Sequence, residues 1–227
     1  MANRLDLDEQ EQLDRLKHFW KQYGNLITWT LILALGGYAA FNGWNWYQRD
    51  LAGKAGTLYD QLDQAAKAGD ADKVARAFAD MKERYAATAF AGQAGLLAAK
   101  AQVDKGQLDA ARASLEWVAA HASESEYRVI ARLRLAGLLL DQGKPEDALA
   151  QLPADAPAAF AGLVADRRGD ILASQGKSAE AIAAYRTAYE AMDTESDYRR
   201  VVEAKLDVLG ASPSLAAASA PAAGASQ

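Results

Sequence analysis

The sequence predicts an all-α protein in which a single N-terminal transmembrane helix precedes an α-solenoid of about four helical hairpins and a capping helix. Three observations support this fold class. The 227 residues are 51% hydrophobic but only 8% aromatic, with much alanine and only 5 prolines, which favours packed helices over a β-sandwich. Residues 22–48 carry no charge. Beyond them, a glycine recurs at positions 69, 106, 143 and 176.

The first expected elements are an acidic segment over residues 1–24 and a transmembrane helix over residues 25–47. The centre of the helix reads LITWTLILALGGYAAF and is flanked by Trp44, Trp46 and Tyr47 as interfacial residues. It meets the requirement of about 20 mostly apolar residues for crossing a bilayer. A cleaved signal peptide is the main alternative, but its apolar core would follow a short basic stretch. The segment that precedes the core here is instead acidic, so we expect an uncleaved anchor. Its acidic residues are Asp6, Asp8, Glu9, Glu11 and Asp14.

Lysine and arginine residues near the two ends of the helix predict its orientation, because the more positive side stays in the cytoplasm. The N-terminal side carries Arg4, Arg15, Lys17 and Lys21, whereas the C-terminal side carries Arg49 and Lys54. We therefore expect a single-pass membrane protein with residues 1–24 in the cytoplasm and everything after the helix on the other side, which in a bacterium is the periplasm.

Three small residues fall on one face of the expected transmembrane helix. Gly36, Ala40 and Gly43 are spaced by four and three residues, so another helix can approach closely along them. The alternative is that glycine and alanine are simply common in membrane helices. The sequence thus indicates a candidate helix-packing face.

A repeat domain is expected over residues 48–210. Each recurring glycine follows a helical stretch and supplies the left-handed cap that turns the chain into a second helix. Five and nine residues after each glycine stand a small or β-branched residue and a large apolar residue, which share one helical face. The pairs are Val74 with Phe78, Ala111 with Leu115, Ala148 with Leu152, and Ala181 with Tyr185. Hairpins with a period in the thirties must stack on their neighbours to bury their apolar faces.

This pattern resembles tetratricopeptide repeats, in which these positions hold the two helices of a hairpin together. The fourth unit matches best, since Gly169, Gly176, Ala181, Tyr185 and Ala188 all occupy family positions. The first unit matches weakly. The third unit departs from the pattern, because Pro153 and Pro157 are expected to end its second helix early.

Two elements are expected after the last hairpin. Residues 196–210 read as a helix that covers the open end of the solenoid. Residues 211–227 are rich in alanine, serine and proline and lack large apolar residues, so we expect a disordered tail.

Charge and composition exclude several classes of function. The formal net charge is −5, from 25 Lys and Arg against 30 Asp and Glu, with no basic run, which argues against a nucleic-acid partner. The chain has no cysteine and only two histidines, His18 and His121, and it contains none of the patterns HExxH, GxGxxG, GxxxxGK[ST] or GxSxG. The sequence therefore predicts a non-enzymatic protein without a metal or cofactor.

Stacked hairpins offer instead a concave surface formed chiefly by the first helix of each pair. The tetratricopeptide groove positions carry over to a mixture of apolar and acidic residues, which suits an extended peptide or a partner helix. These groove candidates are Gln93, Leu96, Lys100 and Asp104, then Ile130, Leu133, Gly137 and Asp141, and finally Leu163, Asp166 and Asp170. The alternative for Ile130 and Leu133 is a role in the core. A separate set of arginines is a candidate contact for an acidic partner: Arg128, Arg132, Arg134, Arg167 and Arg168.

The N-terminal region indicates a more specific family than the repeats alone. Residues 8–25 read DEQEQLDRLKHFWKQYGN and run straight into the anchor, which is similar to the YfgM family of proteobacterial inner-membrane proteins. The matching motif consists of Leu16, Lys17, Trp20, Lys21, Tyr23 and Gly24. The resemblance covers nearly the whole chain apart from the tail.

The resemblance implies an ancillary subunit of the SecYEG translocon with a periplasmic tetratricopeptide domain and a chaperone-like role. It also implies association with the membrane-anchored periplasmic chaperone PpiD and with emerging, unfolded polypeptides. Its alternative is a membrane-anchored regulatory adaptor that binds a cytoplasmic regulator through residues 1–24. The two hypotheses differ in their partners, which are translocon subunits for the first and a soluble cytoplasmic protein for the second.

Overall fold

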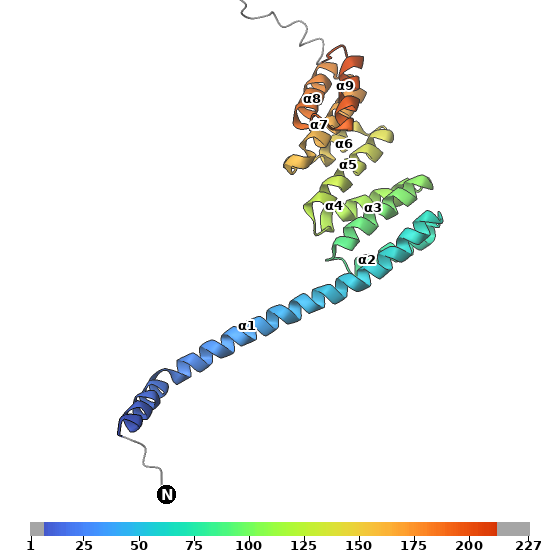
Figure 1. The fold of residues 1–227 in the computed structure, drawn as a ribbon. Coiled ribbons are helices and arrows are strands. Elements are labelled where there is room, and N and C mark those ends of the chain that lie inside the picture. Colours follow the sequence, from blue (N-terminus) through green and yellow to red (C-terminus); the bar gives the residue numbers. More distant parts are fainter. Residues whose placement is uncertain (1–6, 213–227) are drawn as a thin grey trace, which may run out of the picture. The chain divides into compact units, whose positions relative to one another are not determined.

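The computed structural model describes the backbone of residues 7–212 and the side chains of residues 11–212. Within this part of the chain all regular secondary structure is helical, which confirms the all-α class (Figure 1). The helices are α1 (Leu7–Lys67), α2 (Ala71–Arg84), α3 (Ala89–Asp104), α4 (Leu108–His121), α5 (Ser125–Asp141), α6 (Pro145–Gln151), α7 (Ala158–Ser174), α8 (Ser178–Ala191) and α9 (Asp197–Val208). The predicted tail lies outside the described residues apart from Ala211 and Ser212.

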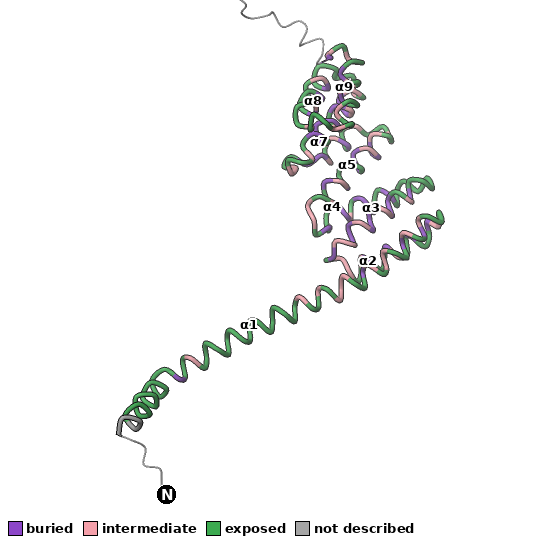
Figure 2. Tube along the Cα trace, viewed as in Figure 1, coloured by how far each residue is buried: buried purple, intermediate pink, exposed green. Residues whose placement is uncertain are grey.

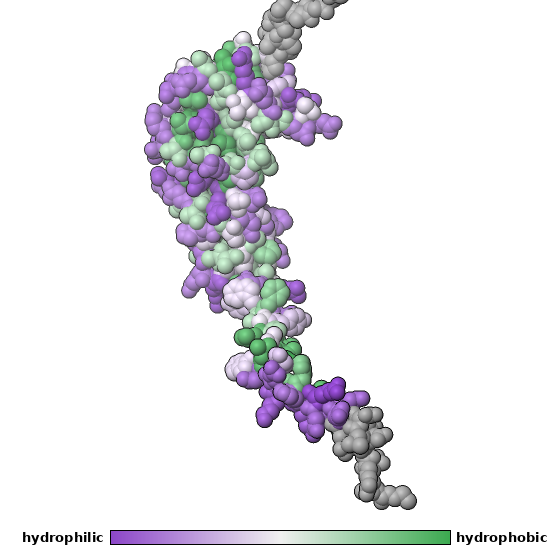
Figure 3. Space-filling view, turned by 90° about the vertical axis from the view of Figure 1, so that its left-hand side faces the viewer, coloured by the Kyte–Doolittle hydropathy of each residue, from purple (hydrophilic) through white to green (hydrophobic). Residues whose placement is uncertain are grey.

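The described chain divides after Leu51 into two compact units, the first of which is the N-terminal part of α1. Its large apolar side chains are exposed, with Trp29 at 59%, Leu33 at 72% and Phe41 at 64%. Figure 2 draws this stretch almost entirely as exposed, and Figure 3 shows hydrophobic side chains covering its middle. Helix α1 is long and apolar enough to span a membrane, as the sequence predicts.

Polar side chains within this apolar stretch bond to the backbone of their own helix. The hydroxyls of Thr28 and Thr30 donate to the carbonyl oxygens four residues earlier, over 2.7 and 2.8 Å. The amide of Asn42 donates to the Tyr38 carbonyl oxygen over 2.9 Å. Unsatisfied polar groups are costly in hydrocarbon, so these bonds suit the helix to a lipid environment.

The helix continues unbroken beyond the expected end of the anchor at residue 47, and its last turns form the first helix of the first hairpin. Ala55 and Leu62 of α1 lie fully buried in one core with Val74 and Phe78 of α2. The expected start of the repeat domain at residue 48 therefore falls inside a continuous helix. The backbone conformation therefore gives no domain boundary at residue 48.

The four recurring glycines and Gly210 all adopt positive φ, between 69° and 74°. Each of the four lies at a helix end where the next backbone N–H bonds back to a carbonyl five residues earlier. The bond from Gln107 N to Gln102 O, for example, measures 2.8 Å, and that from Lys177 N to Leu172 O measures 3.0 Å. This pattern is the Schellman cap, in which the left-handed residue is usually glycine. The predicted turns are confirmed.

The residues five and nine positions after each glycine form the contact between the two helices of a hairpin. All of the former are 0% exposed, and all of the latter are at most 8% exposed. Gly169 shows how tight this contact is, since a Cβ built there would lie 2.4 Å from Cε1 of Tyr185. The helices α1 with α2, α3 with α4, α5 with α6 and α7 with α8 are thus the four expected hairpins.

The second helix of the third hairpin is shorter than its counterparts. Helix α6 has 7 residues, whereas α2, α4 and α8 each have 14. It ends at Gln151, two residues before Pro153, as the proline predicts. Its missing length, at 1.5 Å per residue, is about 10 Å or two turns.

Helix α9 closes the last hairpin, as expected for the capping helix. Its buried residues Val202 and Leu206 share a core with Ala184, Tyr185 and Ala188 of α8. The solenoid therefore does not expose the apolar face of its final hairpin.

Candidate partner-binding groove

The first helices of three successive hairpins, together with Leu115 of α4, line a groove with a cavity of about 430 Å³. We call it the α3–α5–α7 groove. Its apolar floor consists of Ala99, Val103, Leu115 and Leu138, and its polar residues are Lys100, Arg134, Asp141 and Arg167, with Gly137 between them. Three of the groove candidates, Lys100, Gly137 and Asp141, are thus brought together.

The groove is more basic than the sequence indicates, because three basic residues line it, Lys100, Arg134 and Arg167, and one acidic residue, Asp141. Lys100 pairs with Asp104 over 2.6 Å, and Arg167 lies 3.6 Å from the carboxylate of Asp170. Arg134 donates to the backbone oxygen of Leu96 over 3.1 Å, which uses one of its five N–H groups. Its remaining donors face a partly apolar cavity. The arrangement suits an extended chain that presents apolar side chains together with a carboxylate or backbone oxygens.

Sequence reasoning assigned Arg134 and Arg167 to a separate arginine set and did not place them in the groove. Both stand nine residues before a turn glycine, Gly143 and Gly176 respectively, so they occupy equivalent positions of successive repeats. Gly137 lies beside the second of them, since the Arg167 guanidinium is 3.5 Å from where a Cβ on residue 137 would be, an ordinary contact distance. The repeat register alone could have identified this pair.

Several other groove candidates lie at the margin of the cavity or beneath it. Leu96 is only 7% exposed, so its side chain is not part of an open surface, which corrects that expectation. Ile130 and Leu133 are partly buried against the core, as the alternative assignment for them states. Gln93 donates to the Tyr127 hydroxyl over 2.5 Å. A second cavity, of about 600 Å³, is lined by Leu163 with Met192 and Tyr198.

Asp166 is not on an open surface either, because α9 covers it. It is 2% exposed, and its two carboxylate oxygens accept from Lys205 Nζ over 2.7 Å and from the Tyr198 hydroxyl over 2.8 Å. Asp170 accepts from the same Lys205 Nζ over 2.6 Å and from the Tyr185 hydroxyl over 2.9 Å. The expectation that Asp166 lines the groove is therefore wrong. Both carboxylates hold the capping helix instead.

The tyrosines of this network are held in their neutral form. Burial and the hydrogen bond to Asp170 raise the pKa of Tyr185 well above its ordinary value. Burial and the hydrogen bond to Asp166 raise the pKa of Tyr198 to about 12. The Lys205 ammonium also lies 5.3 Å from the centroid of the Tyr185 ring.

The N-terminal motif has a local structural basis. The Trp20 indole lies over Gly24, where an added Cβ would come within 3.2 Å of the indole nitrogen. The rings of Phe19 and Tyr23 pack at 5.2 Å. On the candidate helix-packing face nothing lies within 4 Å of a Cβ built on Gly36 or Gly43, and the same holds for Gly37 on another side of the helix.

Between residues 11 and 212, no group of three or more His, Asp or Glu side chains converges as a metal site. His121 bonds to the Trp117 carbonyl oxygen and stacks on the Trp117 ring at 5.1 Å, which makes it part of the end of α4.

Comparison with known proteins agrees with this architecture. A family model described as a tetratricopeptide repeat-like domain matches residues 17–211. Three curated proteins named "Ancillary SecYEG translocon subunit" are similar to the chain. The protein from Neisseria gonorrhoeae is 34% identical over 207 residues, which cover 89% of this chain and 98% of that protein. The one from Escherichia coli is 29% identical over 81% of this chain and 86% of its own length, and the one from Haemophilus influenzae 26% identical over 75% and 83%. The chain therefore belongs to the family of ancillary SecYEG translocon subunits, the YfgM family that its N-terminal motif indicates.

Proposed function

We propose that this protein is a membrane-anchored scaffold that associates with the SecYEG translocon through α1 and holds partner chains in the α3–α5–α7 groove. The observation that carries the proposal is the match to relatives named as translocon subunits, which extends over 98% of the Neisseria protein. The match covers 89% of this chain, so it is not confined to the expected repeat domain.

The basic residues near the ends of the anchor support an N-terminus in the cytoplasm and a repeat domain in the periplasm. On that side the groove is available to emerging, unfolded polypeptides and to a chaperone such as PpiD, in a chaperone-like role. Its apolar floor and its donors, Arg134 above all, suit backbone and side-chain contacts with an extended chain. The open face at Gly36, Ala40 and Gly43 is the proposed docking surface within the membrane.

A pull-down in mild detergent tests the proposal. The tagged protein, at its native level, is compared with a variant in which residues 25–47 are replaced by an unrelated transmembrane helix. We expect translocon subunits to co-purify with the native anchor only. Translocon-free eluates from both proteins would contradict the proposal, and recovery of a soluble cytoplasmic protein through residues 1–24 would favour the regulatory adaptor instead.

A second variant, Arg134→Glu, separates groove binding from docking. It retains the anchor, so translocon recovery is expected to persist while recovery of chaperone or client chains falls. Equal recovery of chaperone and clients with and without the substitution would rule out the groove as their binding site.

A further inference from the structure

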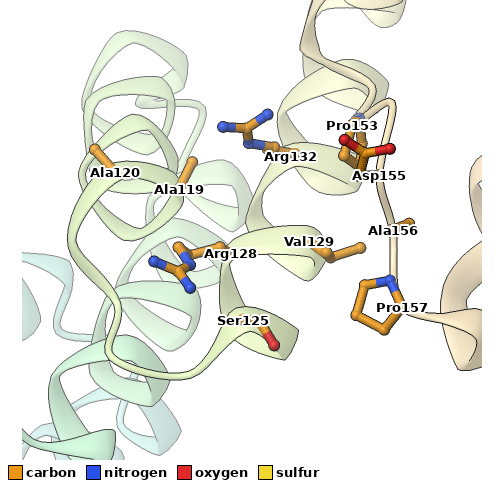
Figure 4. A pocket seen from close by; sticks show the side chains of 10 residues that line it. All are labelled: Ala119, Ala120, Ser125, Arg128, Val129, Arg132, Pro153, Asp155, Ala156 and Pro157. Carbon is orange, nitrogen blue, oxygen red and sulfur yellow. The ribbon is translucent and has the colours of Figure 1, made fainter.

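The shortened helix α6 leaves a further cavity, separate from the α3–α5–α7 groove and from the cavity at Leu163. It has a volume of about 550 Å³ and lies between the end of α4, the first turns of α5 and the connection over residues 152–157 (Figure 4). The second helix of a hairpin runs antiparallel to the first, so the two turns that α6 lacks would lie beside the start of α5. The cavity occupies that place.

The walls of the cavity consist of short side chains and of backbone that prolines hold rigid. Ala119 and Ala120 of α4 form one side, and Pro153 and Pro157 stand on the other, where their rings fix the backbone of the connection. Val129 of α5 faces this connection (Figure 4). The short side chains leave room for the backbone of a visiting helix to approach closely.

Two arginines one helical turn apart provide the charge of the cavity. Arg128 and Arg132 extend from α5 into the space beside α4 (Figure 4). Among the residues from 11 to 212, no carboxylate lies within ion-pair distance of either guanidinium, although other arginines such as Arg112 and Arg200 have such partners. The one acidic residue that lines the cavity, Asp155, stands on the opposite wall.

We propose that this cavity is a docking site for a short acidic helix of a partner protein, which takes the place of the two missing turns of α6. Carboxylates four residues apart on the partner match the spacing of Arg128 and Arg132, and each forms a charge-assisted, bidentate pair with a guanidinium. Alanine or another small residue of the partner faces Ala119 and Ala120. The site is independent of the α3–α5–α7 groove and serves a different class of ligand.

A pair of synthetic peptides tests the proposal on the full-length protein in detergent. Each is a dye-labelled, alanine-based helix of about 14 residues, long enough for marginal helicity, and carries either two Glu or two Gln residues spaced by four. Fluorescence anisotropy is expected to show the Glu peptide binding about tenfold more tightly than the Gln peptide. The variant Arg128→Ala/Arg132→Ala is expected to lose this difference, whereas the groove variant Arg134→Ala, on the same helix, retains it.

A variant with exchanged charges distinguishes a loss of binding from a loss of folding, and circular dichroism checks that each variant is folded. The variant Arg128→Glu/Arg132→Glu is expected to bind the Glu peptide no longer. It is expected to bind instead a peptide that carries two Lys residues at the same two positions. Equal binding of the Glu and Gln peptides by the native protein would overturn the proposal. So would an effect of the arginine substitutions that is seen only with vesicles containing phosphatidylglycerol, because the arginines would then serve the membrane surface.

Discussion

Replacing Lys205 by methionine tests whether the capping helix is held by the carboxylates of α7. Lys205 Nζ lies 2.7 Å from Asp166 and 2.6 Å from Asp170, and the side chain of Asp166 is only 3% exposed. Methionine keeps most of the length of the side chain but removes the charge, so two neighbouring carboxylates lose their shared cation.

The magnitude follows from the exposure of the three groups. Breaking a buried ion pair by removing one partner costs about 3–5 kcal/mol. The side chains of Lys205 and Asp170 are 27% and 22% exposed, so water compensates part of the loss and we expect about 2–3 kcal/mol. If α9 opens locally, its backbone amides should exchange about 30 to 150 times faster.

Hydrogen exchange measured by mass spectrometry on the full-length protein checks this expectation. Arg200→Met is the matched control on the same helix, because the pair of Arg200 with Asp197 is exposed and contributes at most about 1 kcal/mol. Adding Asp166→Asn and Asp170→Asn to Lys205→Met should restore most of the protection, since no uncompensated charge then remains. Unchanged exchange in α9 of the Lys205→Met protein would refute the reasoning.

Three further changes have effects that the structure predicts. Gly169→Ala forces a Cβ against the ring of Tyr185 and should destabilise the protein by about 1–3 kcal/mol in urea unfolding, whereas Gly53→Ala, in open space on a helix, should be neutral or stabilising. Gly176→Ala places a side chain at φ 74° and should cost about 1–2 kcal/mol in the same assay; no loss would argue against the left-handed cap. Because the pKa of Tyr198 is raised to about 12, its neutral hydroxyl contributes stability that is complete below about pH 10 and is lost as the pH rises towards 12. Tyr198→Phe should therefore lessen the fall in stability over this pH window, as measured by circular dichroism.

The turns and the helix pairing of the repeat domain could be predicted from the sequence because they depend on local rules. A glycine at a helix end and apolar residues five and nine positions later determine each hairpin almost by themselves. Pro153 likewise predicts the early end of α6, since the residue before a proline is disfavoured in a helix.

The continuity of α1 could not be predicted from hydropathy, which reports where the chain leaves an apolar environment but not where its helix ends. Residues 48–67 contain no proline and no glycine with positive φ, so nothing breaks the helix before the cap at Gly69. The composition of the anchor predicted a helix apolar enough to span a membrane, but the end of the apolar stretch was not the end of the helix.

The burial of Asp166 depends on tertiary packing, and no local rule indicates it. Its partner Lys205 is 39 residues away, on a helix that the sequence identified only as a cap. The repeat register placed Asp166 on the concave side, whereas the position of α9 decides whether that side is open.

Cross-linking in native membranes tests the central claim, association with the translocon through α1, most directly. A photo-reactive side chain is introduced at Gly36, on the open small-residue face, or at Tyr38 on the opposite face. We predict a cross-link from position 36 to a subunit of SecYEG and a weaker one or none from position 38. The absence of any translocon cross-link from both positions, with the protein present at its native level, would contradict the account.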